Sequence, residues 1–151
     1  MADAERGSGQ PEVAGGGRWL VLYDGDCGFC KWLLAALLRW DSAGRLDPLA
    51  LQRPEADKLL DDLTPEKRTA SWHLISPAGE RWSGGAALPP LLRALPRGRV
   101  PAAIFARIPR LTDRGYRWVA EHRSGLSKFV PLSAKKSASD LVRGRERPIA
   151  S

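Results

Sequence analysis

Hydrophobic residues in the first third of the chain gather in short runs separated by polar turns. Residues 18–23 (RWLVLY) form an apolar run that ends at Asp-Gly-Asp, which is typical of a buried strand followed by a turn. Residues 29–40 are rich in Leu, Ala, Lys and Arg and predict a helix. Residues 46–51 predict a second strand, and Pro48 favours an edge position for it because proline cannot donate a ladder hydrogen bond.

Further helices and strands are predicted as far as residue 130. They are helices over 55–63, from Thr64 onward and over 86–95, a hairpin of 71–76 with 81–82, and two amphipathic helical pieces that divide near Pro109 or Thr112. The resulting order of strands and helices, β-α-β-α-α-β-β-α-α, is that of an α/β sandwich.

The two ends of the chain lack this pattern. Residues 1–17 are dominated by Gly, Ser, Gln and Pro and predict a disordered segment. Residues 131–151 show no hydrophobic periodicity and predict a basic flexible tail. We therefore expect one domain over residues 18–130, which suits a chain of 151 residues with 43% hydrophobic residues.

Two classes of location are disfavoured by the distribution of apolar residues. The N-terminus has no basic start followed by an apolar run, so we expect no signal peptide. The most apolar stretch, residues 32–38, is far shorter than the roughly 20 residues that span a bilayer. We expect a cytoplasmic chain without a membrane span.

The net charge of +7 comes entirely from the C-terminal part of the chain. Residues 90–151 carry 14 basic and 4 acidic side chains. A basic segment with few aromatic residues is typical of a solvated surface, so we expect no specific nucleic-acid binding. The alternative is a non-catalytic interaction protein that uses this basic part on nucleic acid or an anionic membrane.

The chain has two cysteines, Cys27 and Cys30, at the junction of the first predicted strand and helix. A spacing of three residues places both sulfurs on one face of the helix N-terminus, close enough to form a disulfide. The helix dipole favours a thiolate at Cys27, which we expect to attack a disulfide, with Cys30 resolving the mixed disulfide. A C-x-x-C beside a β-α-β pattern is typical of thioredoxin-like redox proteins, and this chemistry needs no cofactor and no metal.

Two other interpretations of the cysteines remain open. A zinc site needs four ligands, and the remaining soft donors, His73 and His122, lie far along the chain. His73 falls in an apolar strand and is more typical of a structural histidine. Alternatively, both cysteines pack in the core as small hydrophobic residues.

Residues 23–30 (YDGDCGFC) resemble the signature of the DCC family of thiol-disulfide oxidoreductases, named for its Asp-x-x-Cys-x-x-Cys pattern. Asp24, Cys27 and Cys30 fill the three named places. Residues 72–79 and 116–123 also resemble the family's central hairpin and late helix, so the resemblance covers about residues 18–127.

The resemblance implies a thioredoxin-like three-layer sandwich with a small mixed sheet and extra C-terminal helices. It also implies dithiol–disulfide exchange with a disulfide- or thiol-bearing protein or small molecule, and with a redox partner that the sequence does not identify. Ordinary thioredoxins place a cis-proline just before the third core strand. Here residues 68–71 (RTAS) occupy that place and the nearest upstream proline is Pro65, and the sequence does not tell whether this departure alters substrate docking.

Residues around the cysteines are assigned supporting roles. Asp24 is a hypothetical proton acceptor for Cys30, and its alternative role is to fix the turn by hydrogen bonds. Asp26 is expected to cap the helix, although a carboxylate there also disfavours a thiolate at Cys27. Gly28 and Phe29 complete the motif, and Phe29 with Trp32 forms either an apolar rim for a partner or part of the core.

A different enzyme class is suggested by the first strand and its Asp24-Gly25-Asp26 ending. This arrangement resembles the nucleophile and acid of haloacid-dehalogenase-like phosphatases. That family also needs a later Lys and an acidic pair for magnesium, for which Asp61-Asp62 is a poor substitute.

Overall fold

The computed structural model describes residues 17–146, so the predicted disordered segment over 1–17 lies outside it except for Gly17. Four strands form one mixed sheet in the order β2-β1-β3-β4. They are β1 (Trp19–Tyr23), β2 (Leu46–Ala50), β3 (His73–Ile75) and β4 (Arg81–Ser83). β1 is parallel to β2 and antiparallel to β3, which is antiparallel to β4.

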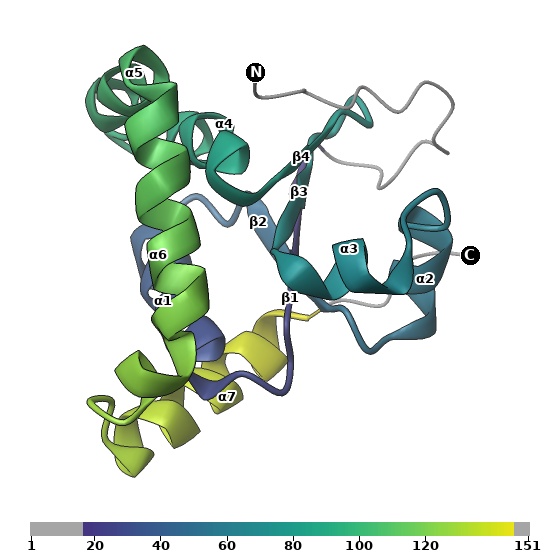
Figure 1. The fold of residues 1–151 in the computed structure, drawn as a ribbon, viewed down its shortest axis with the longest axis vertical. Helices are drawn as coiled ribbons and strands as arrows, with labels where there is room; N and C mark the ends of the chain where they lie inside the picture. Colours follow the sequence, from purple (N-terminus) through teal and green to yellow (C-terminus); the bar gives the residue numbers. More distant parts are fainter. Residues whose placement is uncertain (1–16, 147–151) are drawn as a thin grey trace.

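Helices cover both faces of this sheet (Figure 1). They are α1 (Gly28–Trp40), α2 (Pro54–Leu59), α3 (Pro65–Ala70), the 3-10 helix η1 (Gly84–Ala87), α4 (Leu88–Ala94), α5 (Arg99–Arg107), α6 (Pro109–Ser127) and α7 (Leu132–Arg145). Side chains alternate along β1, so Val21 and Tyr23 join the core with α1, α4 and α7, while Leu20 and Leu22 pack with α2. The predicted thioredoxin-like α/β sandwich with a small mixed sheet is confirmed.

Several local predictions are also confirmed. β2 is an edge strand and contains Pro48, as the missing backbone donor requires. The two C-terminal helical pieces divide at Pro109, where α5 has ended and α6 begins. His73 is structural: it is 1% exposed, and its ring nitrogens lie 2.6 Å from Ser83 Oγ and 2.9 Å from the Arg68 carbonyl oxygen.

Helix α6 is held close to the sheet by a glycine contact. A Cβ on Gly85 would lie 2.9 Å from the Cα of Asp113, so only glycine lets η1 and α6 approach this closely. Tyr116, one turn further along α6, accepts a 3.3 Å hydrogen bond from the Trp72 backbone N–H. These contacts place α6 across the chain segment that enters β3.

The prediction of a flexible tail from residue 131 was wrong for residues 132–145. These residues form α7, which packs against α1 (Figure 1) and buries Ala138 and Val142. Arg145 also donates a 2.8 Å hydrogen bond to the buried carboxylate of Asp41. The helical periodicity of α7 is weak in the sequence because this helix buries Ala138 and Val142, four residues apart, rather than a stripe of large hydrophobic residues. Among the helices of residues 17–146, none has the length and hydrophobicity needed to cross a bilayer.

Candidate active site

The two cysteines occupy the first turn of α1, directly after β1 and its connecting loop. Cys27 is the N-cap residue, and its sulfur accepts a hydrogen bond from the Cys30 backbone N–H at 3.2 Å. Both thiols are free and half-buried. The structure therefore brings the two sulfurs of the predicted pair to the same turn, with the sulfur of Cys27 at the helix N-terminus, where unpaired N–H groups favour negative charge.

The loop before Cys27 is held in shape by Asp24 and Gln52. Asp24 Oδ1 accepts hydrogen bonds from the Asp26 backbone N–H at 3.0 Å and from Gln52 Nε2 at 2.9 Å. Gln52 Oε1 in turn accepts from the Gly25 N–H at 3.0 Å. Asp24 thus has the turn-fixing role that was one of its two predicted functions.

Asp26 does not cap the helix as expected. The cap is Cys27, and the exposed carboxylate of Asp26 instead accepts a 3.3 Å hydrogen bond from Gln52. A side chain can cap only when its oxygen or sulfur reaches the N–H groups of the first turn. The loop hydrogen bonds hold Asp26 toward β2, which leaves the first-turn N–H of Cys30 to the Cys27 sulfur.

The environment of Cys30 raises its pKa from 9.0 to about 12. Burial is the main cause, followed by the hydrogen bond to Cys27 and the negative charge of Cys27. Asp24 raises this pKa further, whereas the Arg123 guanidinium lowers it. Arg123 and Asp24 also form an ion pair at 3.6 Å. Cys30 is therefore a protonated thiol at neutral pH in the reduced pair.

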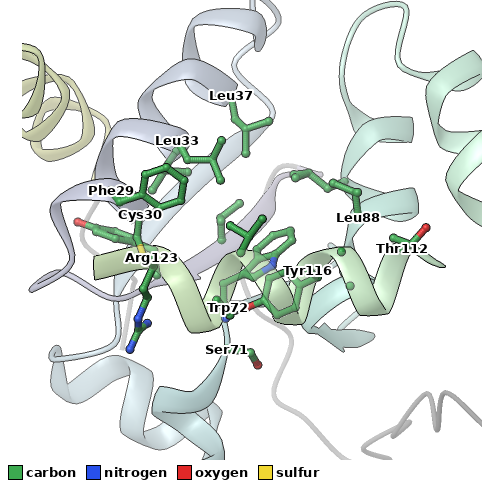
Figure 2. A pocket seen from close by; sticks show the side chains of 18 of the residues that line it. Phe29, Cys30, Leu33, Leu37, Ser71, Trp72, Leu88, Thr112, Tyr116 and Arg123 are labelled. Atoms are coloured by element: carbon green, nitrogen blue, oxygen red, sulfur yellow. Dashed lines mark hydrogen bonds between the residues drawn. The ribbon is translucent and has the colours of Figure 1, made fainter. Parts of the chain in front are cut away.

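A cavity of about 520 Å³ opens beside Cys30. Its walls come from β1, α1, η1, α4, α5, α6 and the segment before β3, and most of its lining side chains are apolar. Figure 2 shows Cys30 and Arg123 toward one end, Leu88 and Thr112 toward the other, and Tyr116 between them. Of the two cysteines, Cys30 lines this cavity and Cys27 does not.

Gly28 and Phe29 lie between the two cysteines and face different neighbours. A Cβ on Gly28 would approach the Lys135 side chain of α7 to 3.3 Å, so α7 covers the start of α1. Phe29 lines the cavity and lies 6.0 Å, centroid to centroid, from the Trp32 ring, which is 36% exposed. Phe29 is thus part of the cavity wall.

The segment before β3 contributes side chains in place of a proline. Thr69, Ser71 and Trp72 line the cavity, and Trp72 directly precedes β3. No cis peptide bond occurs among the described residues. The Trp72 backbone N–H is bonded to Tyr116 Oη.

The residues considered for metal or phosphatase chemistry have other neighbours. Within residues 17–146, no three His, Cys, Asp or Glu side chains cluster in a way that could hold a metal ion. Asp62 binds the buried guanidinium of Arg81, with a 2.7 Å contact to Nη1, and this pairing lowers the pKa of Asp62. The ring of His122 lies against Trp118, 4.5 Å between centroids.

Three functional neighbours of the pair were missed by sequence reasoning. Gln52 follows a strand that is parallel to β1, and parallel strands bring their carboxyl ends to the same edge, so its position was a usable signal. Arg123 and Tyr116 reach the site from α6, far along the chain. Both fall in residues 116–123, which resemble the family's late helix, but that segment does not by itself indicate that they reach the cysteines, because their placement depends on how α6 crosses the sheet.

A family model for DCC1-like thiol-disulfide oxidoreductases matches residues 21–129, which include both cysteines, the whole of α6 and all of the sheet except the first two residues of β1. Searches of curated proteins and of solved structures gave no match. The matched region covers well over half of the chain and agrees with the architecture and the C-x-x-C position described above. The chain belongs to the DCC1-like thiol-disulfide oxidoreductase family.

Proposed function

We propose that Cys27 and Cys30 exchange a dithiol for a disulfide with a thiol- or disulfide-bearing protein or small molecule. The Cys27 thiolate attacks one sulfur of a substrate disulfide, the substrate S–S bond breaks, and the leaving sulfur takes up a proton. The Cys30 thiolate then attacks the Cys27 sulfur and releases the second substrate thiol. The pair is oxidised to a disulfide while the substrate gains two electrons and two protons. A separate redox partner returns the pair to the dithiol.

The observation that carries this proposal is the 3.2 Å hydrogen bond from the Cys30 N–H to the Cys27 sulfur at the N-cap of α1. It places one sulfur at the helix N-terminus and the other on the same turn. Free cysteines that only fill a core are fully buried and inert, whereas these two are half-buried, Cys27 follows a charged loop, and Cys30 lines a cavity.

Asp24 is proposed as the group that takes the proton from Cys30. Its charge acts on the Cys30 thiol, and its second carboxylate oxygen, Oδ2, faces Arg123. Asp24 also positions the loop through Asp26 and Gln52. Arg123, which favours a negative charge at Cys30, assists the same proton transfer.

Thiol counting in a graded glutathione buffer tests the proposal. Because the chain has two cysteines, every thiol counted belongs to the pair. The native wild-type protein is expected to change reversibly between two thiols and none, whereas Cys27→Ser and Cys30→Ser each keep one thiol or form a mixed disulfide with glutathione. Two thiols that stay unreactive in the native state would overturn the proposal.

The order of attack is tested by trapping. With Cys30→Ser, the mixed disulfide on Cys27 has no resolving thiol and is expected to accumulate with an excess of a small disulfide. With Cys27→Ser, the buried Cys30 is expected to form its mixed disulfide more slowly. Faster trapping on Cys30 than on Cys27 would reverse the assignment of the two roles.

A further inference from the structure

We propose that the cavity beside Cys30 binds the hydrocarbon part of an uncharged, lipophilic small-molecule disulfide or thiol. The inference rests on the proposed function of the cysteine pair, because it assigns a substrate class to that pair. The cavity has a volume of about 520 Å³ and lies between α1 and α6, with Cys30 toward one end (Figure 2).

The size of the cavity suits a small molecule. Protein interiors are close-packed and leave few voids larger than a water molecule. Sites for small ligands usually enclose about 300 to 1,000 Å³ and are lined mainly by apolar side chains. The cavity falls within this range, and Leu33, Leu37, Leu88 and Phe105 are among the residues that form its walls.

The buried hydroxyl of Thr112 and the two charged groups on the lining are already engaged. The Thr112 hydroxyl donates to the backbone oxygens of Ile108 at 3.0 Å and Phe105 at 3.2 Å. The two charges at the Cys30 end, Asp24 and Arg123, face each other. A ligand with several charges or an extended peptide backbone would lose its hydrogen bonds to water here without replacement, which is costly in an apolar site. An uncharged hydrocarbon chain incurs no such cost.

The entrance is marked by lining residues that are also exposed to solvent. Ile108 is 39% exposed and Leu111 is 63% exposed, and both lie where α5 meets α6. Gly115, one turn further along α6, is exposed and also lines the cavity. The residues that line this entrance are apolar, which suits an apolar molecule.

The reaction is the two-step exchange described above, with the substrate's carbon chain in the cavity. Such a chain brings its sulfur toward the Cys30 end, next to the turn that carries Cys27. One dialkyl disulfide is reduced to two alkyl thiols, and the cysteine pair is oxidised to a disulfide. Electrons and protons balance without a further reactant in this half of the cycle.

The test uses Gly115→Phe as a cavity-filling variant and Gly125→Phe as its matched control. A Cβ at either position meets no atom within 4 Å, so neither substitution forces the backbone to move. Both glycines lie in α6, where a larger residue is favoured over glycine for helix formation. Gly115 lines the cavity and Gly125 does not.

The rate at which the reduced protein is oxidised is measured with dimethyl, dibutyl and hydroxyethyl disulfides. Each rate is divided by the rate at which the same disulfide oxidises dithiothreitol, a dithiol that has no cavity. Burying one methylene strengthens binding about fourfold, so the three extra methylenes of one butyl chain are expected to raise the wild-type rate about 60-fold over the methyl compound. Gly125→Phe should keep this ratio, and Gly115→Phe should bring it close to one. Hydroxyethyl disulfide should react equally with wild type and Gly125→Phe.

The outcomes separate this inference from the proposed function. The inference would be overturned if wild type preferred dibutyl over dimethyl disulfide no more than dithiothreitol does, or no more than Gly115→Phe does, while hydroxyethyl disulfide still oxidises the pair. Failure of every disulfide to oxidise the native pair would overturn the proposed function. Binding of the uncharged dye Nile red then tests the cavity without redox chemistry: binding lost in Gly115→Phe and kept in Gly125→Phe supports an apolar ligand site, and no binding to wild type refutes it.

Discussion

The ionisation of Cys30 can be predicted from the groups that surround it. The perturbation is Cys27→Ser, which leaves Cys30 as the single thiol of the chain. Burial, the largest cause of its raised pKa, survives this change, whereas the negative charge of Cys27 is lost. The pKa of Cys30 in this variant is therefore expected to lie above 9.0 and below the value of about 12 in the intact pair.

The size of the effect on reactivity follows from the fraction of thiolate. At about pH 8, a thiol with a pKa of about 12 is ionised in about one molecule in ten thousand, against about one in ten for a pKa of 9.0. Because the thiolate is the reacting species, alkylation of Cys30 in the folded variant should be slowed by up to about a thousandfold relative to the unfolded chain. The alkylation rate of Cys30 in folded Cys27→Ser is expected to fall between the rates for these two pKa values.

The assay is the rate of iodoacetamide alkylation of Cys30 against pH, read by mass spectrometry, with the guanidinium-unfolded variant as control. Adding Asp24→Asn removes a nearby negative charge and should lower the pKa of Cys30. Adding Arg123→Gln removes a positive charge and should raise it. A midpoint at or below 9.0 in the folded Cys27→Ser protein, or shifts of the same sign in both double variants, would refute this account of the site.

Three further predictions concern stability. Asp41→Ala removes a buried carboxylate that accepts hydrogen bonds from the N–H groups of Arg45 and Leu46 at 2.9 Å and from Arg145 at 2.8 Å. Urea denaturation should show that the free energy of unfolding falls by about 3–5 kcal/mol. A fall below about 1 kcal/mol would contradict the role given to α7. Gly85→Ala places a Cβ 2.9 Å from the Asp113 Cα and should cost about 1–3 kcal/mol in the same measurement; an unchanged midpoint would show that α6 can move away freely. The pKa of Cys30 is raised on folding, so its contribution to stability is complete below pH 9.0 and is lost as the pH rises toward about 12. The difference in unfolding free energy between reduced wild type and Cys30→Ala should therefore fall over that interval. A constant difference would argue against the raised pKa.

Local sequence was sufficient to predict the centre of the site. The strand, the turn and the helix that carry Asp24, Cys27 and Cys30 are contiguous, so the apolar run and the C-x-x-C spacing specify them without knowledge of the rest of the fold. The same holds for Pro48 at the sheet edge and for the helix break at Pro109. Each of these depends on backbone chemistry within a few residues.

The features that were missed depend on contacts between distant segments. Arg123 meets Asp24 only because α6 crosses the sheet, and the cavity exists only because α1, α5 and α6 are placed around it. α7 was missed because Ala138 and Val142 are small and look unremarkable in a basic segment, although both are buried against the rest of the core. The sequence predicts Asp26 rather than Cys27 as the helix cap because Gln52, which holds Asp26, comes from the turn after β2, more than 20 residues along the chain.

In the proposed mechanism, the contacts of the pair favour attack by Cys27 before attack by Cys30. In the reduced pair, the hydrogen bond to Cys27 and the charge of Cys27 both raise the pKa of Cys30, so Cys30 stays protonated. Once Cys27 is bonded to a substrate sulfur, its sulfur carries no negative charge, and this contribution is lost while the attraction of Arg123 for a thiolate remains. The pKa of Cys30 should therefore fall at the step that requires its thiolate. In the proposed exchange, attack by Cys27 therefore promotes the second step, in which Cys30, the cysteine that lines the cavity, releases the product.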